Sequence, residues 1–317
     1  MTNLKSSNSF KTTFTKEQQE QISLGEYKRI DTSIYAKPFY KGKQMEQIRL
    51  GIEKGLDASI YANPNYSWRQ MEQIRLGLED KVDVSKYASP KYDWMQMRQI
   101  RLGLKSKVDV SKYADTCYDY TQMYEIRLGI EEGLNVPIYI DPNYDWMQME
   151  QIRLGLKSNL DVSKYANPKY SHSQMDYIRC FLEKGVDVSI LSDTRFNWDQ
   201  MMNIMWGEEE KVDTSIFADP KYDYDQMQQI RLGLKSNLDV TPYLNEKYSW
   251  EQMDQIRLGL VAGLDVTPYL NEAYSCELMY AIRIHLIQKE DYKYLLKTPL
   301  TDSKYYEIAF NMERNNG

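Results

Sequence analysis

Cysteine and histidine are scarce in this sequence, which limits the chemistry that it can carry. Its 317 residues include three cysteines and two histidines. Cys117, Cys180 and Cys276 are at least 63 residues apart, which fits neither a disulfide framework nor the spacing of zinc ligands. His172 and His285 have no cysteine or carboxylate at metal-ligand spacing, and we expect both to be ordinary surface or inter-helix residues. We therefore expect no metal, no cofactor and a reducing compartment.

Long apolar runs and an excess of positive charge are also missing. No apolar stretch approaches the roughly 18 residues that a membrane span requires, and the polar residues 1–14 contain no hydrophobic signal segment. The net charge of -6 argues against a dedicated nucleic-acid binder, because neutralising phosphates requires a clustered excess of lysine and arginine. We expect a cytoplasmic protein without membrane contact, in which residues 1–14 form a flexible tail.

The sequence is dominated instead by one repeated pattern. Methionine recurs every 26 residues without insertion or deletion, isoleucine follows three residues later, and arginine stands beside that isoleucine in nine copies. Such a fixed period is the signature of tandem structural repeats. The methionines are Met45, Met71, Met97, Met123, Met149, Met175, Met201, Met227, Met253 and Met279.

The unit 67–92 predicts two helical segments. Ser67 with Gln70 forms a capping box, in which each side chain bonds an orphan backbone N–H, so a long helix begins there. Its apolar residues fall on one face at 100° per residue. Asp83 is a second helix cap, followed by a short segment of one or two turns. Pro90 ends this segment, because the residue before proline avoids helical dihedral angles.

The same register can be followed along nearly the whole chain. It predicts twelve long helices, whose caps lie at 15, 41, 67 and so on to 301, with short segments between them. One unit is too small to bury its own apolar face, so neighbouring units must stack. We predict an all-α fold, an alpha-solenoid or superhelix of tandem helix-turn-short-helix repeats. The array spans 15–288, and 289–317 forms a C-terminal capping half-repeat.

The arginine series allows a structural and a functional interpretation. The arginines lie within the apolar arc of the helical wheel, so we expect a ladder in which each one pairs with a neighbouring unit. The alternative is a row of anion-binding groups along a groove. Arg127, Arg153 and Arg179 are the candidate binding residues of this series.

Glycine and aromatic residues recur at fixed positions as well. A mid-helix glycine such as Gly77 costs about 1 kcal/mol relative to alanine, so we expect the short helix to cross closely there, with a bend as the alternative. The glycines match no phosphate-binding motif. Aromatic residues follow many of the caps, as Trp68 and Trp94 do, and could stack nucleobases, but their helical spacing favours packing in the core.

The repeat departs from its pattern between residues 180 and 217. Phe181 replaces glycine, Leu191 replaces tyrosine, Met205 replaces arginine and Trp206 replaces leucine. Large apolar side chains at formerly small or charged positions often mark interfaces, so these four residues are our candidate partner-binding patch. Neutral drift within one unit is the alternative.

Residues 70–92 and 148–170 carry a resemblance to a known repeat. Their sequences, QMEQIRLGLEDKVDVSKYASPKY and QMEQIRLGLKSNLDVSKYANPKY, resemble a 26-residue helical repeat in uncharacterised proteins of Firmicutes, their phages and mobile elements. The likeness covers Thr15 to about Met312. It implies a setting, the cytoplasm of a bacterial host, and a phage or plasmid product that acts on a host protein, but no catalytic residue.

The resulting hypothesis is a non-enzymatic, protein-binding repeat scaffold, an inhibitor or adaptor from a mobile element that acts on a host defence protein. Acid–base catalysis needs a convergent cleft, whereas this sequence offers repeated, equivalent surfaces. The alternative is a protein that sequesters nucleotides or nucleic acid with its arginine and aromatic ladders; we expect this less, and steep salt dependence would identify it.

Overall fold

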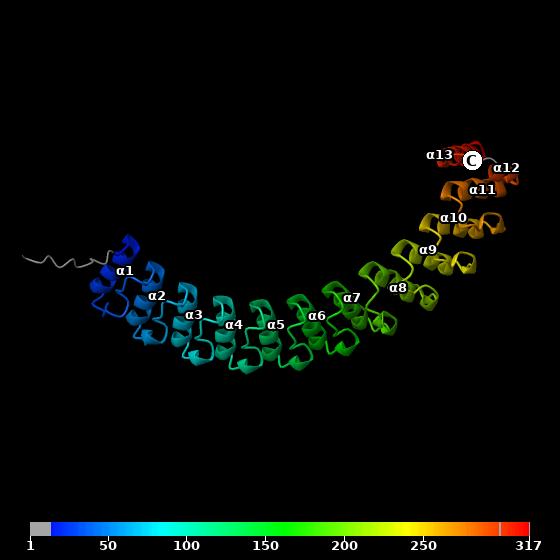
Figure 1. Cartoon of the computed structure of the whole chain (residues 1–317). Helices are drawn as coiled ribbons and strands as arrows, with labels where there is room; N and C mark the ends of the chain where they lie inside the picture. The colour runs from blue at the N-terminus through cyan, green and yellow to red at the C-terminus, as the bar shows by residue number, and fades with distance from the viewer. Residues whose placement is uncertain (1–13, 298, 317) are drawn as a thin grey trace, which may run out of the picture. The chain divides into compact units, whose positions relative to one another are not determined.

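The computed structural model describes residues 14–297 and 299–316, and these residues form helices and no strand (Figure 1). The all-α solenoid of tandem repeats is confirmed. The predicted tail lies outside the described residues, apart from Phe14. Of the two compact units, one ends at Asn159 and the other begins at Leu160. The sequence-based division after residue 288 stays a prediction.

In the first unit, six long helices alternate with short connecting segments. Each long helix has 12 residues, and consecutive helices from α1 to α6 pack against each other. The long helices are α1 (Lys16–Tyr27), α2 (Gly42–Glu53), α3 (Trp68–Glu79), α4 (Trp94–Lys105), α5 (Tyr120–Glu131) and α6 (Trp146–Lys157). The single 3-10 turns are η1 (Ala58–Ile60), η2 (Val84–Lys86), η3 (Val110–Lys112) and η4 (Val136–Ile138).

The second unit continues the same register and ends differently. Its last predicted short segment is an α-helix, α12, so α13 is the twelfth long helix of the described chain. The long helices are α7 (His172–Glu183), α8 (Trp198–Glu210), α9 (Tyr224–Lys235), α10 (Trp250–Val261), α11 (Cys276–Gln288) and α13 (Asp302–Asn316), and α12 spans Lys293–Lys297. The 3-10 turns are η5 (Val162–Lys164), η6 (Ser189–Ser192), η7 (Thr214–Ile216), η8 (Thr241–Tyr243) and η9 (Thr267–Tyr269).

The capping glutamine joins the start of a long helix to the end of the same repeat. Gln70 Oε1 accepts from the Ser67 N–H at 2.7 Å, which completes the predicted capping box. Its Nε2 also donates at 2.6 Å to the carbonyl of Tyr92, the last residue of the same repeat and the one before the next helix cap. One buried side chain therefore starts a helix and fixes the neighbouring turn. In α11, Leu278 replaces this glutamine, and the clamp is absent from that last full repeat.

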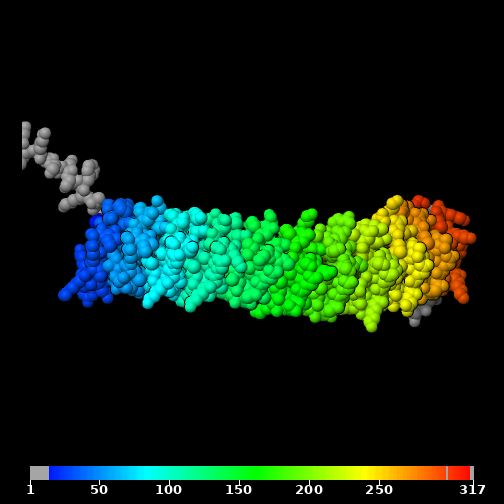
Figure 2. All heavy atoms as spheres, turned by 90° about the horizontal axis from the view of Figure 1, so that it is seen from below, coloured from blue at the N-terminus to red at the C-terminus, as the bar shows by residue number. Residues whose placement is uncertain are grey.

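The periodic methionines and isoleucines form the core of each unit. Met71 and Ile74 are completely buried, as are their counterparts from Met45 and Ile48 onward. Burying such a side chain contributes roughly 1.5–3 kcal/mol, so the stacked helices supply the stability that a single repeat lacks. In Figure 2 the side chains of successive repeats of the first unit are in continuous contact on the face shown.

The mid-helix glycines make room for the short segment of their own repeat. A methyl group on Gly77 would lie 1.9 Å from the Tyr87 hydroxyl, which donates to the Gln73 carbonyl at 3.0 Å. The predicted close crossing is confirmed. The same contact joins Gly25 with Tyr35, Gly51 with Tyr61, Gly103 with Tyr113, Gly129 with Tyr139, Gly233 with Tyr243, and Gly259 with Tyr269.

Candidate binding face

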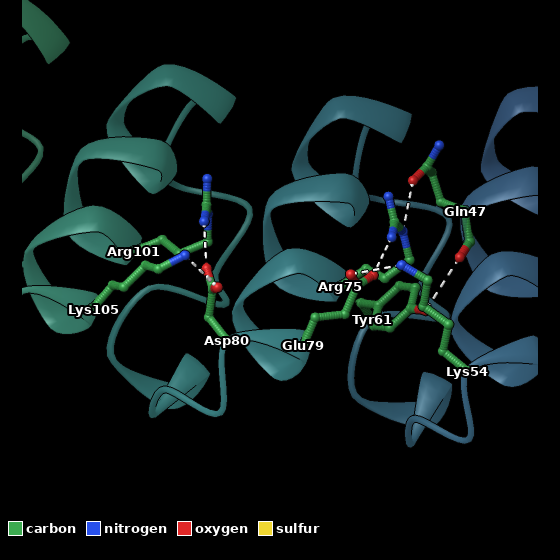
Figure 3. A network of polar contacts seen from close by, with 8 residues as sticks. All are labelled: Gln47, Lys54, Tyr61, Arg75, Glu79, Asp80, Arg101 and Lys105. Atoms are coloured by element: carbon green, nitrogen blue, oxygen red, sulfur yellow. Dashed lines mark hydrogen bonds and ion pairs between the residues drawn. The ribbon is translucent and has the colours of Figure 1, made fainter.

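The arginines form a ladder between neighbouring long helices. Arg75 Nε donates to Gln47 Oε1 of the preceding helix at 3.1 Å, and its NH1 pairs with Glu79 (Figure 3). One rung later, Arg101 Nε donates to the next glutamine at 3.2 Å, and its NH1 pairs with Asp80 at 2.6 Å. Each rung therefore joins an arginine to the residue 28 positions earlier, and the carboxylate partner varies from rung to rung.

Arg127 and Arg153 belong to this ladder, Arg179 stands at the same position of its repeat, and all three are engaged within the fold. Arg127 and Arg153 are buried, and Arg179 is half-buried. These guanidinium groups already hold charge-assisted hydrogen bonds, which favours the structural interpretation over a row of free anion sites. Arg127 bonds Gln99 at 3.1 Å and Glu131 at 2.7 Å, Arg153 bonds Glu125 at 2.7 Å and Glu132 at 3.1 Å, and Arg179 bonds Asp176 at 2.5 Å and Glu183 at 2.7 Å.

The candidate patch around α7 and α8 is mostly core. Phe181, Leu191 and Met205 are at most 7% exposed, so our interpretation of them as an exposed patch is corrected. They occupy positions that face the neighbouring segments in every repeat, and their larger or more apolar side chains fill that space. Trp206 alone remains half-buried, with the Arg231 guanidinium 5.2 Å from the centre of its ring.

These departures come in matched pairs. Phe181 stands where other repeats have the glycine, and Leu191 stands where they have its tyrosine partner. Met205 stands in place of the arginine, and Tyr177, 28 residues earlier, stands in place of its glutamine. In both of these pairs the two partners change together, which keeps the volume and polarity of the contact balanced.

The aromatic residues that follow the helix caps are not core residues, contrary to our expectation. Tyr120, Trp146, Trp198 and Trp250 are between 38% and 45% exposed. Trp68, Trp94 and Tyr224 are half-buried. A periodic row of partly exposed rings therefore runs along each unit.

The fifth residue after each cap lies beside this row and differs from repeat to repeat. The positions before and after it are nearly invariant, because they are the buried glutamine, methionine, isoleucine and arginine of the framework. We call the first, second and fifth residues of the long helices the groove face. Its fifth residues in α3 to α11 are Glu72, Arg98, Tyr124, Glu150, Asp176, Met202, Gln228, Asp254 and Tyr280.

Each unit has a hollow on its groove face. In the first unit, a hollow of about 410 Å³ lies between α4, α5 and α6, with Tyr124 and Trp146 beside Arg98 and Glu150. In the second unit, a hollow of about 300 Å³ lies between α10, α11 and α13. Its lining combines rings and carboxylates: Trp250, Glu251, Asp254, Gln255, Cys276, Glu277, Tyr280 and Tyr306.

The charge on the groove face differs between the units. In the first, Lys43 Nζ is 5.0 Å from the centre of the Trp68 ring. The Arg69 guanidinium is 5.0 Å from the same ring and 5.3 Å from that of Trp94. In the second, the equivalent second residues of α8 to α11 are all acidic: Asp199, Asp225, Glu251 and Glu277.

These carboxylates are close enough to affect one another. Burial raises the pKa of Asp225, and the neighbouring Asp223, Glu251 and Asp199 charges raise it further. Burial, together with Glu277, also raises the pKa of the Cys276 thiol to about 11, so this sulfur is a neutral part of the hollow at neutral pH. The three thiols are not joined in disulfides.

The two histidines occupy different environments. His285 is buried where other repeats have glycine, and its Nδ1 and Nε2 lie 2.7 Å from the Ala281 carbonyl and 2.9 Å from the Tyr294 hydroxyl. It is the expected inter-helix residue. His172 begins α7 and is half-buried. Within the described residues, no three histidine, cysteine or acidic side chains are placed to hold a metal ion, and no helix is long and apolar enough to span a membrane.

No protein-family model matches the chain, and no similar curated protein or solved structure is found. The groove face is therefore assigned as the candidate site from the comparison of the repeats with one another. Our sequence reasoning missed it because we looked for residues that break the repeat in large steps. The better signal was already readable: one position changes chemistry in nearly every copy while its neighbours stay fixed.

Proposed function

We propose that this chain is a non-enzymatic scaffold that binds a partner protein along its groove face. One observation carries the proposal: the fifth helix position varies on a partly exposed aromatic face, while the surrounding framework repeats. In repeat proteins such a surface offers extended contact, since each unit contributes one small part of it. Partly exposed tryptophan and tyrosine are also the residues most enriched at protein-binding hot spots.

A protein partner fits this face better than nucleic acid does. The ladder arginines already bond glutamines and carboxylates, so they offer few free donors to phosphates. The exposed rings of the second unit stand beside carboxylates, which repel a phosphate backbone. The resemblance of the repeat to phage and mobile-element proteins supports a bacterial host protein as the partner, and an inhibitor or adaptor role. The free thiols fit a reducing cytoplasm.

The proposal is tested by comparing capture by wild type and variants from a nuclease-treated bacterial lysate. The groove variant carries Tyr124→Ala, Trp146→Ala and Trp250→Ala. A matched control carries Phe39→Ala and Ile60→Ala, which remove exposed apolar side chains outside the long helices. Thermal unfolding checks that both variants fold.

We expect the wild type and the control to retain the same protein, identified by mass spectrometry, and the groove variant to lose it. Direct titration of the purified partner should show an affinity loss of about 100-fold or more for the groove variant, because hot-spot residues cost about 2 kcal/mol or more each. Equal retention by both variants contradicts the proposal. Retention of nucleic acid, and of no protein, from a parallel lysate without nuclease favours the sequestering alternative.

A further inference from the structure

On the groove face of the first unit, lysine and arginine side chains lie over tryptophan rings. Lys43 and Arg69, second residues of their helices, lie over Trp68, and Arg69 also reaches Trp94. The ring face is negative, so a cation placed over it is held electrostatically. Here the chain supplies cations to its own aromatic row.

The second unit has the rings without these cations. Among the described residues, no lysine or arginine stands over Trp198, Tyr224 or Trp250. The neighbouring second positions hold Asp225 and Glu251 instead. This part of the groove face therefore combines open aromatic rings with carboxylates, the combination that complements a cation from another molecule.

The hollow at α10, α11 and α13 gives this surface a concave end. Trp250, Tyr280 and Tyr306 supply its rings, and the centres of the two tyrosine rings are 5.8 Å apart. Glu251 and Glu277 supply carboxylates, whereas Asp254 is already paired with Arg257 and Tyr280 has Arg283 against its ring. Trp250 and the two glutamates are thus the available groups.

We propose that the groove face of the second unit, from Trp198 to Glu277, binds an extended basic segment of the partner protein. This inference rests on the proposed function and adds the chemistry of the partner. Lysine or arginine side chains of the segment lie over the rings of Trp198, Tyr224 and Trp250, and their charges pair with the adjacent carboxylates.

The repeat also sets the spacing of those cations. Neighbouring packed helices lie about 10 Å apart. An extended chain in the polyproline II conformation advances about 3.1 Å per residue with three residues per turn, so every third side chain lies about 9 Å further along and points to the same side. A segment with a cation at every third position therefore presents one cation to each repeat, and a cluster of adjacent cations does not.

Peptide titration of the full chain tests this register. One probe is a twelve-residue peptide with arginine at every third position and glycine and serine between. Its isomer has the same composition with the arginines adjacent. Calorimetry and tryptophan fluorescence measure both affinities at low and moderate salt. We expect the spaced peptide to bind more tightly than its isomer.

Variants then locate the binding surface. Glu251→Gln with Glu277→Gln should weaken the spaced peptide about fivefold, and Trp250→Leu about threefold. The charge-matched control carries Glu246→Gln and Glu290→Gln, exposed residues outside the groove face, and should bind as wild type does. Circular dichroism confirms that all variants fold.

Three results would overturn the inference: no binding of the spaced peptide, equal affinity for the two isomers, or an equal loss in the charge-matched control, which would show attraction by net charge alone. None of these results by itself contradicts the proposal that the chain is a protein-binding scaffold. If lysate capture still depends on Tyr124, Trp146 and Trp250, only the basic-segment inference has failed. If that dependence is also absent, the binding face itself is wrong.

Discussion

The pair α4–α5 in the first unit and the pair α7–α8 in the second occupy the same register but use different chemistry. In the first pair, Gly103 admits Tyr113, and Arg127 bonds Gln99. In the second, the corresponding positions are Phe181 with Leu191 and Met205 with Tyr177. Both pairs keep the helix–turn–helix geometry. The fold therefore requires complementary partners at each contact rather than one particular residue.

The largest expected effect comes from placing the phenylalanine of α7 at the equivalent glycine of α4 while keeping the tyrosine partner. We expect Gly103→Phe to destabilise the protein by about 4 kcal/mol, because even a methyl group there would lie 1.9 Å from the Tyr113 hydroxyl. Adding Tyr113→Leu recreates the α7 arrangement and should recover more than half of the loss. Chemical denaturation of both single variants and the double variant measures the coupling.

Additive effects in that cycle would contradict pairwise compensation. Gly103→Ala is the milder control. Its helix propensity alone would stabilise the protein by about 1 kcal/mol, so a net loss shows that the tyrosine contact outweighs propensity.

A second transfer concerns the ladder. Met205 is completely buried, and its neighbour at the glutamine position is Tyr177. Met205→Arg should cost about 3 kcal/mol, since it buries a charge without the usual amide acceptor. Adding Tyr177→Gln should restore part of this loss by supplying that acceptor. Thermal unfolding of the single and double variants checks the order, and an undiminished loss in the double variant would mean that the ladder is not modular.

Much of the fold could be predicted because its signals are local and repeated. Ser67 with Gln70 and Asp83 with Ser85 are caps within four residues of chain, and the structure places helices after both. Gly77 predicted a close crossing because glycine within a helix lowers stability relative to alanine, and a nearby segment that leaves no room for a side chain accounts for it. The identity of the crossing group, the Tyr87 hydroxyl, could not be predicted, since it depends on where the 3-10 turn lies in space.

The site was harder to predict because exposure depends on neighbours. Trp146 and Met149 lie three residues apart in one helix, and apolar residues recur at both positions. The first is nevertheless 40% exposed and the second is fully buried. Periodicity alone does not show which part of the helix the short segment covers. Phe181 shows the opposite case: a large apolar departure that looks like an interface fills core space once its partner Leu191 is known.

A smaller effect tests the tyrosine hydroxyl that most repeats have and the repeat of Phe217 lacks. The Tyr113 hydroxyl donates to the Gln99 carbonyl at 3.3 Å, whereas Phe217 has no such group beside Gly207. Tyr113→Phe should cost about 1 kcal/mol, the net value of one hydrogen bond. Phe217→Tyr should stabilise by a similar amount or less. Denaturation midpoints of the two variants compare them directly, and a stabilising Tyr113→Phe would show that the phenol is needed only for its volume.

The smallest effect concerns the one charged rung among the described glutamine-type positions of α2 to α6. Arg153 pairs with Glu125, where the neighbouring rung has Gln99 bonding Arg127. Burial raises the pKa of Glu125, and the hydrogen bond from Arg153 opposes that rise. The folded state then binds this proton more tightly than the unfolded state does. Its contribution to the unfolding free energy therefore falls as pH rises from the ordinary glutamate pKa through the raised folded value.

Glu125→Gln removes this titration and makes the rung resemble its neighbours. The variant should differ from wild type by no more than about 1 kcal/mol, because the amide still accepts the Arg153 hydrogen bond. The stability of wild type relative to the variant should decline as the pH is raised through the range above the ordinary glutamate pKa. Urea denaturation across that range measures the difference. If wild type instead gains relative stability as pH rises, the attraction of Arg153 exceeds the burial cost, and the charged rung is the stronger form of the ladder.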